Sequence, residues 1–287
     1  MKNWARYNFK FMQSKNLNFF LANLFFAAII LFYIFILWQG QKIGGFFLTA
    51  FFTLSVFIFT LWHAFRKFGA RNAILFLILV LSVSLGAEFI GANLANNFEG
   101  YYKYSEFLGW KFLNIPVLII LMWAAIIYLS YQVSEHITNF RFTKHTPFLQ
   151  KFWVSFWCAL LTSLVVVAWD FSLEPLAVEM GWWSWLHPGE YFGVPINNFF
   201  GWMTISFSVV FLYKIFFERE RPEEATLFDY APVIGYAMIC FFTILTAINI
   251  NKPIFALIAF TGMFPFACIM VVRFLVSRLN FPEQYRK

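Results

Sequence analysis

Apolar runs of about 20 residues recur along the whole sequence, and they restrict the fold more than any other feature. Hydrophobic residues fill 61% of the 287 positions and charged residues only 12%, whereas a soluble domain carries about 25% charged residues. A helix needs about 20 apolar residues to cross a bilayer, and backbone in lipid must satisfy its own hydrogen bonds. The sequence therefore predicts an all-α bundle of transmembrane helices, forming a single integral membrane domain over residues 1–287.

The apolar runs also predict the number of helices and their orientation. About eight transmembrane helices are expected, at 17–38, 43–65, 72–95, 114–135, 152–170, 196–217, 229–249 and 253–275. With a cytoplasmic N-terminus, 17 of the 21 Lys and Arg residues fall on the cytoplasmic side and 4 on the other. This positive-inside bias predicts two cytoplasmic termini in the cell membrane. Because the basic residues flank apolar runs and form no continuous stripe, we expect no nucleic acid partner.

Few side chains suit metal, redox or nucleotide chemistry. The three Cys lie in apolar runs without a C-x-x-C pair, and the four His show no H-x-x-H or H-x-x-x-H spacing. A membrane di-iron hydroxylase or desaturase needs clustered His. A membrane prenyltransferase needs several Asp to hold magnesium diphosphate, but Asp170 and Asp229 are the only two. No phosphate loop or dinucleotide motif occurs. Acid–base chemistry or binding of an apolar ligand remains, with no cofactor or metal expected.

Three carboxyl groups lie in or next to apolar segments, where charge is costly. Glu88 lies about two thirds of the way along the predicted helix 72–95 and needs a partner, a proton or a wet cavity. Asp170 ends a predicted helix, where it could act as an acid, cap the helix or form an ion pair. Glu174 follows one helical turn later, but Pro175 disfavours helical geometry before it, so we expect a turn there. Two close carboxyl groups favour one retained proton, which provides a general acid.

Aromatic and amide side chains gather on two predicted outer connections, about 96–113 and 171–195. Their rings form either an interfacial aromatic belt or a pocket wall whose π faces stabilise a cation. The amides could orient a water molecule or a carboxylate. The candidate binding residues are Asn93, Tyr102, Tyr104, Trp183, Trp185, Tyr191, Asn198 and Trp202.

The segment "AWDFSLEPLAVEMGWWSW…GEYFGVPINNFFGW" (168–202) resembles the carotenoid biosynthesis membrane family that includes bisanhydrobacterioruberin hydratases and carotenoid 1′,2′-hydratases. The family pattern is an Asp four residues before an acid-Pro pair, then Gly-x-Trp-x-Trp, Tyr-Phe-Gly-Val/Ile-Pro and Asn-Phe-x-Gly-Trp. The pattern begins here at Asp170 and ends at Trp202, with Glu174 where the family has Asp. The similarity covers a core of about 82–202, which includes Glu88.

The resemblance implies a cofactor-independent hydro-lyase that adds water to the terminal C1=C2 double bond of an acyclic carotenoid end group. Substrates of the lycopene, γ-carotene or bisanhydrobacterioruberin type are expected, together with water, membrane lipids and other carotenoid-pathway enzymes as partners. Asp170 is the expected proton donor, with Glu88 and Glu174 as its partner, base or water holder. Two alternatives stay open: an end-group cyclase or isomerase, which excludes water after the same protonation, and a non-catalytic carotenoid or lipid carrier.

Overall fold

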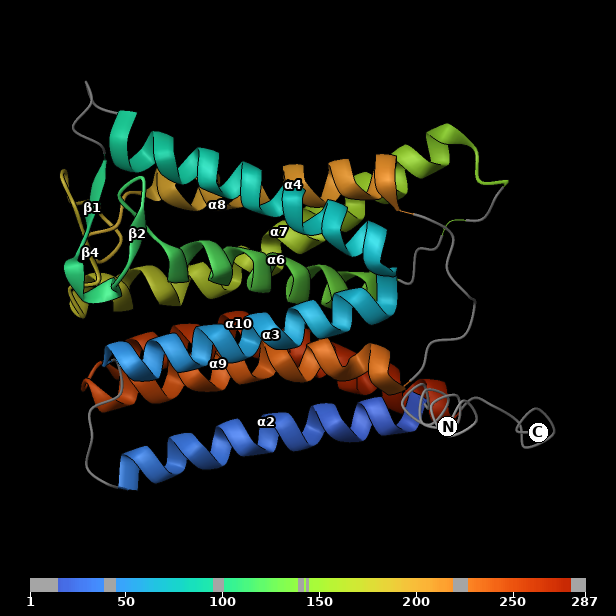
Figure 1. Ribbon diagram of the computed structural model, residues 1–287, viewed down its shortest axis with the longest axis horizontal. Coiled ribbons are helices and arrows are strands. Elements are labelled where there is room, and N and C mark those ends of the chain that lie inside the picture. Colours follow the sequence, from blue (N-terminus) through green and yellow to red (C-terminus); the bar gives the residue numbers. More distant parts are fainter. Residues whose placement is uncertain are drawn as a thin grey trace, which may run out of the picture.

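The computed structural model describes residues 15–38, 45–94, 101–138, 142, 145–218 and 227–279. Within these ranges, eight long α-helices run side by side along one axis (Figure 1). They are α2 (Lys15–Trp38), α3 (Phe46–Phe68), α4 (Ala70–Phe89), α6 (Val117–Thr138), α7 (Phe148–Glu179), α8 (Ile196–Leu212), α9 (Ala231–Asn249) and α10 (Pro253–Leu279). Short helical turns extend or precede some of them: η1 (Ile90–Leu94), η2 (Glu106–Leu108), η3 (Tyr213–Phe217) and η4 (Leu227–Tyr230).

The predicted all-α transmembrane bundle is confirmed. Seven helical segments of the described chain are long and apolar enough to cross a membrane, and α10 begins with a shorter apolar stretch, Pro253–Ile269. The first residue of α2 and the last of α10 lie at the same end of the bundle (Figure 1), as an even number of crossings requires. The cytoplasmic location of that end remains a prediction from the Lys and Arg count.

Helix α6 lies in the core of the bundle and α2 at its edge. All twelve residues from Trp123 to Ser134 of α6 are buried. Helix α6 packs against α3, α4, α7, α8, α9 and α10. Figure 1 shows α2 at one edge of the bundle, and its Leu31 is 65% exposed. The core of this protein is therefore built around α6.

Helix α7 corrects the sequence-based prediction. The predicted helix ended at Asp170, with a turn and an outer connection from 171 to 195. In the structure α7 continues as one helix through Pro175 to Glu179. The outer connection therefore begins nine residues later than expected.

A side-chain hydrogen bond accounts for the tolerance of proline inside α7. Pro175 has no N–H for the carbonyl of Phe171, four residues earlier. The Tyr191 hydroxyl donates to that Phe171 oxygen at 3.0 Å. Because the orphaned carbonyl has a partner, the helix can run past the proline.

Short strands close the end of the bundle that carries the two long connections (Figure 1). Strands β2 (Lys111–Phe112) and β3 (Ile115–Pro116) form a hairpin, and β1 (Tyr102–Tyr104) pairs antiparallel with β4 (Trp183–Trp185). The two connections, far apart in sequence, are thus joined through their backbones above the ends of α4 and α7.

Candidate active site

Strand alternation places four aromatic side chains on one face of the β1–β4 pair. Tyr102 pairs with Trp185, and Tyr104 with Trp183. Neighbouring side chains in a strand point to opposite faces, so these four rings share a face while the residues between them are exposed. The ring centroids are 5.0 Å apart in the first pair and 5.8 Å in the second. This aromatic face covers the end of the bundle.

Glu88 of α4 reaches this face and accepts three hydrogen bonds. Its Oε2 accepts from the hydroxyls of Tyr102 at 2.6 Å and Tyr104 at 2.7 Å, and its Oε1 accepts from Trp123 Nε1 at 2.7 Å. Both oxygens of the carboxyl group therefore act as hydrogen-bond acceptors in the structure. The structure thus supplies the partners that the buried Glu88 was expected to need.

A close backbone approach allows Tyr102 to reach Glu88. The turn η1 follows α4, and a Cβ atom at Gly91 would lie 2.6 Å from the Tyr102 hydroxyl oxygen. Asn93, a predicted binding residue, lies in the same turn. It donates to the Leu113 carbonyl at 3.1 Å and accepts from Asn114 at 2.8 Å. Asn93 therefore fastens the β2–β3 hairpin to η1.

Asp170 and Glu174 lie one turn apart on the continuous α7, so their carboxyl groups share a helix face. Glu174 Oε2 accepts from Trp183 Nε1 at 3.0 Å. Asp170 is fully buried, and its Oδ2 has a long 3.4 Å contact with Asn198 Nδ2. Its Oδ1 has no hydrogen-bond partner among the described residues. Glu174 therefore has a hydrogen bond from Trp183 of β4, whereas Asp170 has only the long contact with Asn198.

These side chains surround a cavity of about 400 Å³, which we call the carboxyl cavity. Its wall contains two of the three predicted acids and six of the eight predicted binding residues. The lining residues are Glu88, Tyr102, Tyr104, Ile119, Met122, Trp169, Leu173, Glu174, Trp183, Trp185, Asn198 and Trp202. Asp170, Asn93 and Tyr191 are not among them. Asp170 is linked to the wall through Asn198, and Tyr191 supports α7.

Sequence reasoning missed Trp123 and Trp169 as site residues. The indole of Trp123 stacks on Trp202 with ring centroids 3.7 Å apart, and Trp169 meets Trp202 edge to face at 5.9 Å. Trp123 had one signal: it lies inside a predicted apolar helix, away from the interfaces where belt tryptophans occur. Trp169 had only its position next to Asp170.

The electrostatic character of the carboxyl cavity favours positive charge. Its wall combines two carboxyl groups with the faces and edges of tyrosine and tryptophan rings, and no lining residue is basic. Aromatic faces attract cations, most strongly where water is excluded. The cavity is therefore suited to a short-lived cation in an apolar molecule.

The two tyrosines remain hydrogen-bond donors at ordinary pH. Burial raises the pKa of the Tyr102 and Tyr104 hydroxyls well above the usual value, and the negative charge of Glu88 raises it further. Both hydroxyls therefore keep the proton that they donate to Glu88.

A second cavity of about 640 Å³, the apolar cavity, adjoins the first. The two cavities share Ile119, Met122, Trp169, Leu173 and Trp183. The apolar cavity extends between α3, α6, α7 and α9, and no charged side chain lines it. A long hydrocarbon could thus lie in the apolar cavity with one end in the carboxyl cavity.

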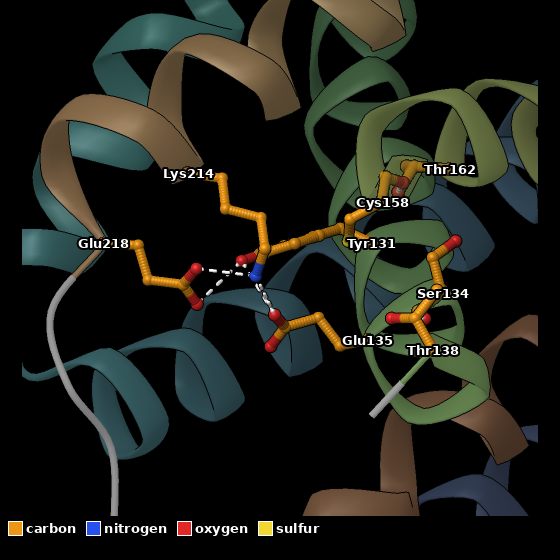
Figure 2. Close-up of polar contacts among 8 residues, drawn as sticks. All are labelled: Tyr131, Ser134, Glu135, Thr138, Cys158, Thr162, Lys214 and Glu218. Atoms are coloured by element: carbon orange, nitrogen blue, oxygen red, sulfur yellow. Dashed lines mark hydrogen bonds and ion pairs between the residues drawn. The ribbon is translucent and has the colours of Figure 1, made fainter. Parts of the chain in front are cut away.

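A separate polar cluster lies at the opposite end of the bundle. Lys214 of η3 is completely buried, and its Nζ lies 2.6 Å from both Glu135 Oε1 and Glu218 Oε2. Figure 2 shows Lys214 pointing between these two carboxylates beside Tyr131, whose hydroxyl donates to both. Local pairing therefore satisfies this buried charge.

The described part of the chain offers no group of three or more His, Cys, Asp or Glu side chains arranged to hold a metal ion. The fold and site together define a multi-pass α-helical membrane protein with acidic and aromatic groups around a buried cavity. The family of carotenoid biosynthesis proteins matches residues 44–266, and the chain belongs to this family. Neither curated proteins nor solved structures gave a match. The match supports a role in carotenoid biosynthesis, with a carotenoid as substrate in a membrane.

Proposed function

We propose that the protein is a cell-membrane carotenoid hydratase, which adds water to the terminal C1=C2 double bond of an acyclic end group and yields a tertiary alcohol. One observation carries this proposal: Glu88 and Glu174 face aromatic rings in a cavity that continues into an uncharged one. The end group fits the carboxyl cavity, and the hydrocarbon chain behind it fits the apolar cavity.

Glu174 is the acid in this proposal. It lines the cavity and transfers its proton to C2, so that the electron pair of the double bond forms the new C–H bond and C1 becomes a tertiary cation. Asp170 was the proton donor expected from the sequence, but it does not line the cavity. We assign it the role of a partner that shares one proton with Glu174, because two close carboxyl groups do not both ionise readily.

The remaining groups stabilise the cation and position the water. Trp169 and Trp202 present their rings to the cavity, and Glu88 is a fixed negative charge held by three donors. The buried Trp185 Nε1 has no hydrogen-bond partner among the described residues and is available to hold the incoming water. The water oxygen bonds to C1 and releases its proton to the Glu174 carboxylate, which restores the acid.

The test is to express the chain in a lycopene-producing host and to follow the pigments by mass. The product should be heavier than the substrate by one water. In membranes incubated anaerobically in ¹⁸O-water with a chelator, the new hydroxyl should carry the heavy oxygen. A product of unchanged mass with a new ring or shifted double bond would point to a cyclase or isomerase. Unchanged bound pigment, also after Glu174→Gln, would point to a carrier.

A further inference from the structure

A third cavity lies at the edge of the bundle beneath α2. We call it the edge cavity; its empty space, which includes space open to the surroundings, is about 220 Å³. Its lining residues are Ile29, Ile30, Tyr33, Phe52, Met238, Phe241, Phe242 and Leu245. Two of these, Phe52 and Phe242, also line the apolar cavity. The edge cavity and the apolar cavity are therefore neighbours with a shared aromatic border.

The border consists of stacked rings. Phe52 of α3 and Phe242 of α9 lie with centroids 4.2 Å apart and planes at 15°. Tyr33 of α2 meets both rings edge-on, at 5.9 and 4.7 Å. Its hydroxyl donates to the Leu48 carbonyl at 2.9 Å, which fixes the Tyr33 ring. Only these side chains separate the two cavities along this border.

The edge cavity is also close to the lipid-facing surface. Phe241, in its wall, is 43% exposed, and α2 lies at one edge of the bundle (Figure 1). The polar groups in its wall are limited to the Tyr33 hydroxyl, which is already bonded to Leu48. A flat hydrocarbon can thus move from lipid past these rings without leaving apolar surroundings.

We propose that the polyene chain of the carotenoid enters laterally from the bilayer between α2 and α9. It passes the Phe52–Phe242 stack, crosses the apolar cavity and delivers its end group to the carboxyl cavity. What happens to the end group once it arrives depends on the proposed hydratase function. The binding route itself follows from the shared linings of the three cavities.

Two neighbouring residues of α2 provide a matched test. Ile30 lines the edge cavity, whereas Leu31 faces lipid at 65% exposure. Ile30→Trp should fill the cavity and lower both pigment co-purification and turnover by about tenfold, because the indole occupies the space that the polyene chain would cross. Leu31→Trp adds the same ring on the lipid side and should behave like the wild type. Leu245→Trp fills the cavity from α9 and should reproduce the Ile30→Trp effect.

The outcomes separate this route from the hydratase reaction. Suppose that the wild type hydrates the pigment and that Ile30→Trp and Leu245→Trp bind and convert it normally. This result would overturn the route and leave the hydratase reaction intact. Suppose instead that the wild type and Leu31→Trp bind the pigment without hydrating it, and that only the two cavity-filling variants fail to bind it. This result would support the route and reject the hydratase reaction. Thermal unfolding in detergent identifies a variant that fails to fold, in which case the other cavity-filling variant decides.

Discussion

Replacing Glu88 by glutamine perturbs the centre of the site while almost preserving its shape. The carboxylate now receives hydrogen bonds from Tyr102, Tyr104 and Trp123. In the variant the amide oxygen can take the place of Oε2 and accept from both tyrosines. The amide NH₂ then faces Trp123 Nε1, which lies 2.7 Å from Oε1 in the wild type. Two donors oppose each other, and a buried indole N–H loses its acceptor.

The expected cost follows from these three bonds. A hydrogen bond to a charged group contributes about 1.5–3 kcal/mol, and a neutral one about 1 kcal/mol. One bond is lost and two change from charged to neutral acceptors, so the variant should lose about 2.5–7 kcal/mol of stability. Pigment turnover should fall further than the folded fraction, because the fixed negative charge beside the cation is also removed.

The assay is thermal unfolding of purified protein in detergent, followed by tryptophan fluorescence and by size-exclusion chromatography. Glu190→Gln is a matched control, since Glu190 is an exposed carboxylate on the same connection as β4. Trp123→Phe removes the opposing donor, so combining it with Glu88→Gln should cost less than the two changes added separately. Equal stability of Glu88→Gln and Glu190→Gln, with no coupling to Trp123, would refute the three-donor arrangement.

Four further predictions concern the acids, the tyrosines, the opposite end of the bundle and topology. Glu174→Gln should lower turnover about 10²–10⁴-fold with pigment still bound. Asp170→Asn should also lower turnover, and Glu174→Asp should retain more activity than either variant. Normal pigment conversion by Asp170→Asn would remove Asp170 from the mechanism. Folding raises the pKa of Tyr102 and Tyr104 above the usual 10.0. The two tyrosines therefore contribute fully to the free energy of unfolding below pH 10, and this contribution declines above pH 10 by at most about 1.4 kcal/mol per pH unit for each tyrosine. Stability should thus fall less steeply with rising pH in Tyr104→Phe than in the wild type. Lys214→Met removes the buried cation that lies between Glu135 and Glu218 and should cost about 3–5 kcal/mol. Neutralising both glutamates in the same chain should partly restore the stability measured by thermal unfolding. A cysteine at the exposed Ser184, with the native cysteines removed, should react with an impermeant thiol reagent in intact cells; labelling only in opened cells would reverse the predicted orientation.

The sequence was sufficient to predict the transmembrane bundle but not the full course of α7. Apolar runs define helices because a backbone in lipid must form its own hydrogen bonds, and this constraint is local. The helix end expected at Asp170 was wrong, and the helix runs past Pro175 because the hydroxyl of Tyr191, sixteen residues beyond the proline, donates a hydrogen bond to the Phe171 carbonyl. Such a tertiary contact leaves no local pattern in the chain.

The composition of the site could be predicted in part, and its assembly could not. Buried acids and clustered aromatics are visible as unusual residues in an apolar chain, and most of those predicted line the carboxyl cavity. What brings them together is the pairing of Tyr102 with Trp185 and of Tyr104 with Trp183. These partners are about 80 positions apart, and both strands have only three residues. A pairing this short and this distant has no periodicity that the sequence could reveal.

The proposed reaction also accounts for the separation of the two buried charged clusters. Hydration takes one proton from the acid and returns one from the captured water, so it needs no path for protons through the bundle. The Lys214 cluster at the far end can therefore serve stability alone, with Lys214 paired to Glu135 and Glu218 and the Tyr131 hydroxyl bonded to both carboxylates. The wall of the carboxyl cavity instead includes Trp185, whose N–H has no partner among the described residues, and the nearby Asp170 has an oxygen that is also without one. Polar groups left unpaired beside an apolar cavity indicate where a water molecule and an alkene can meet.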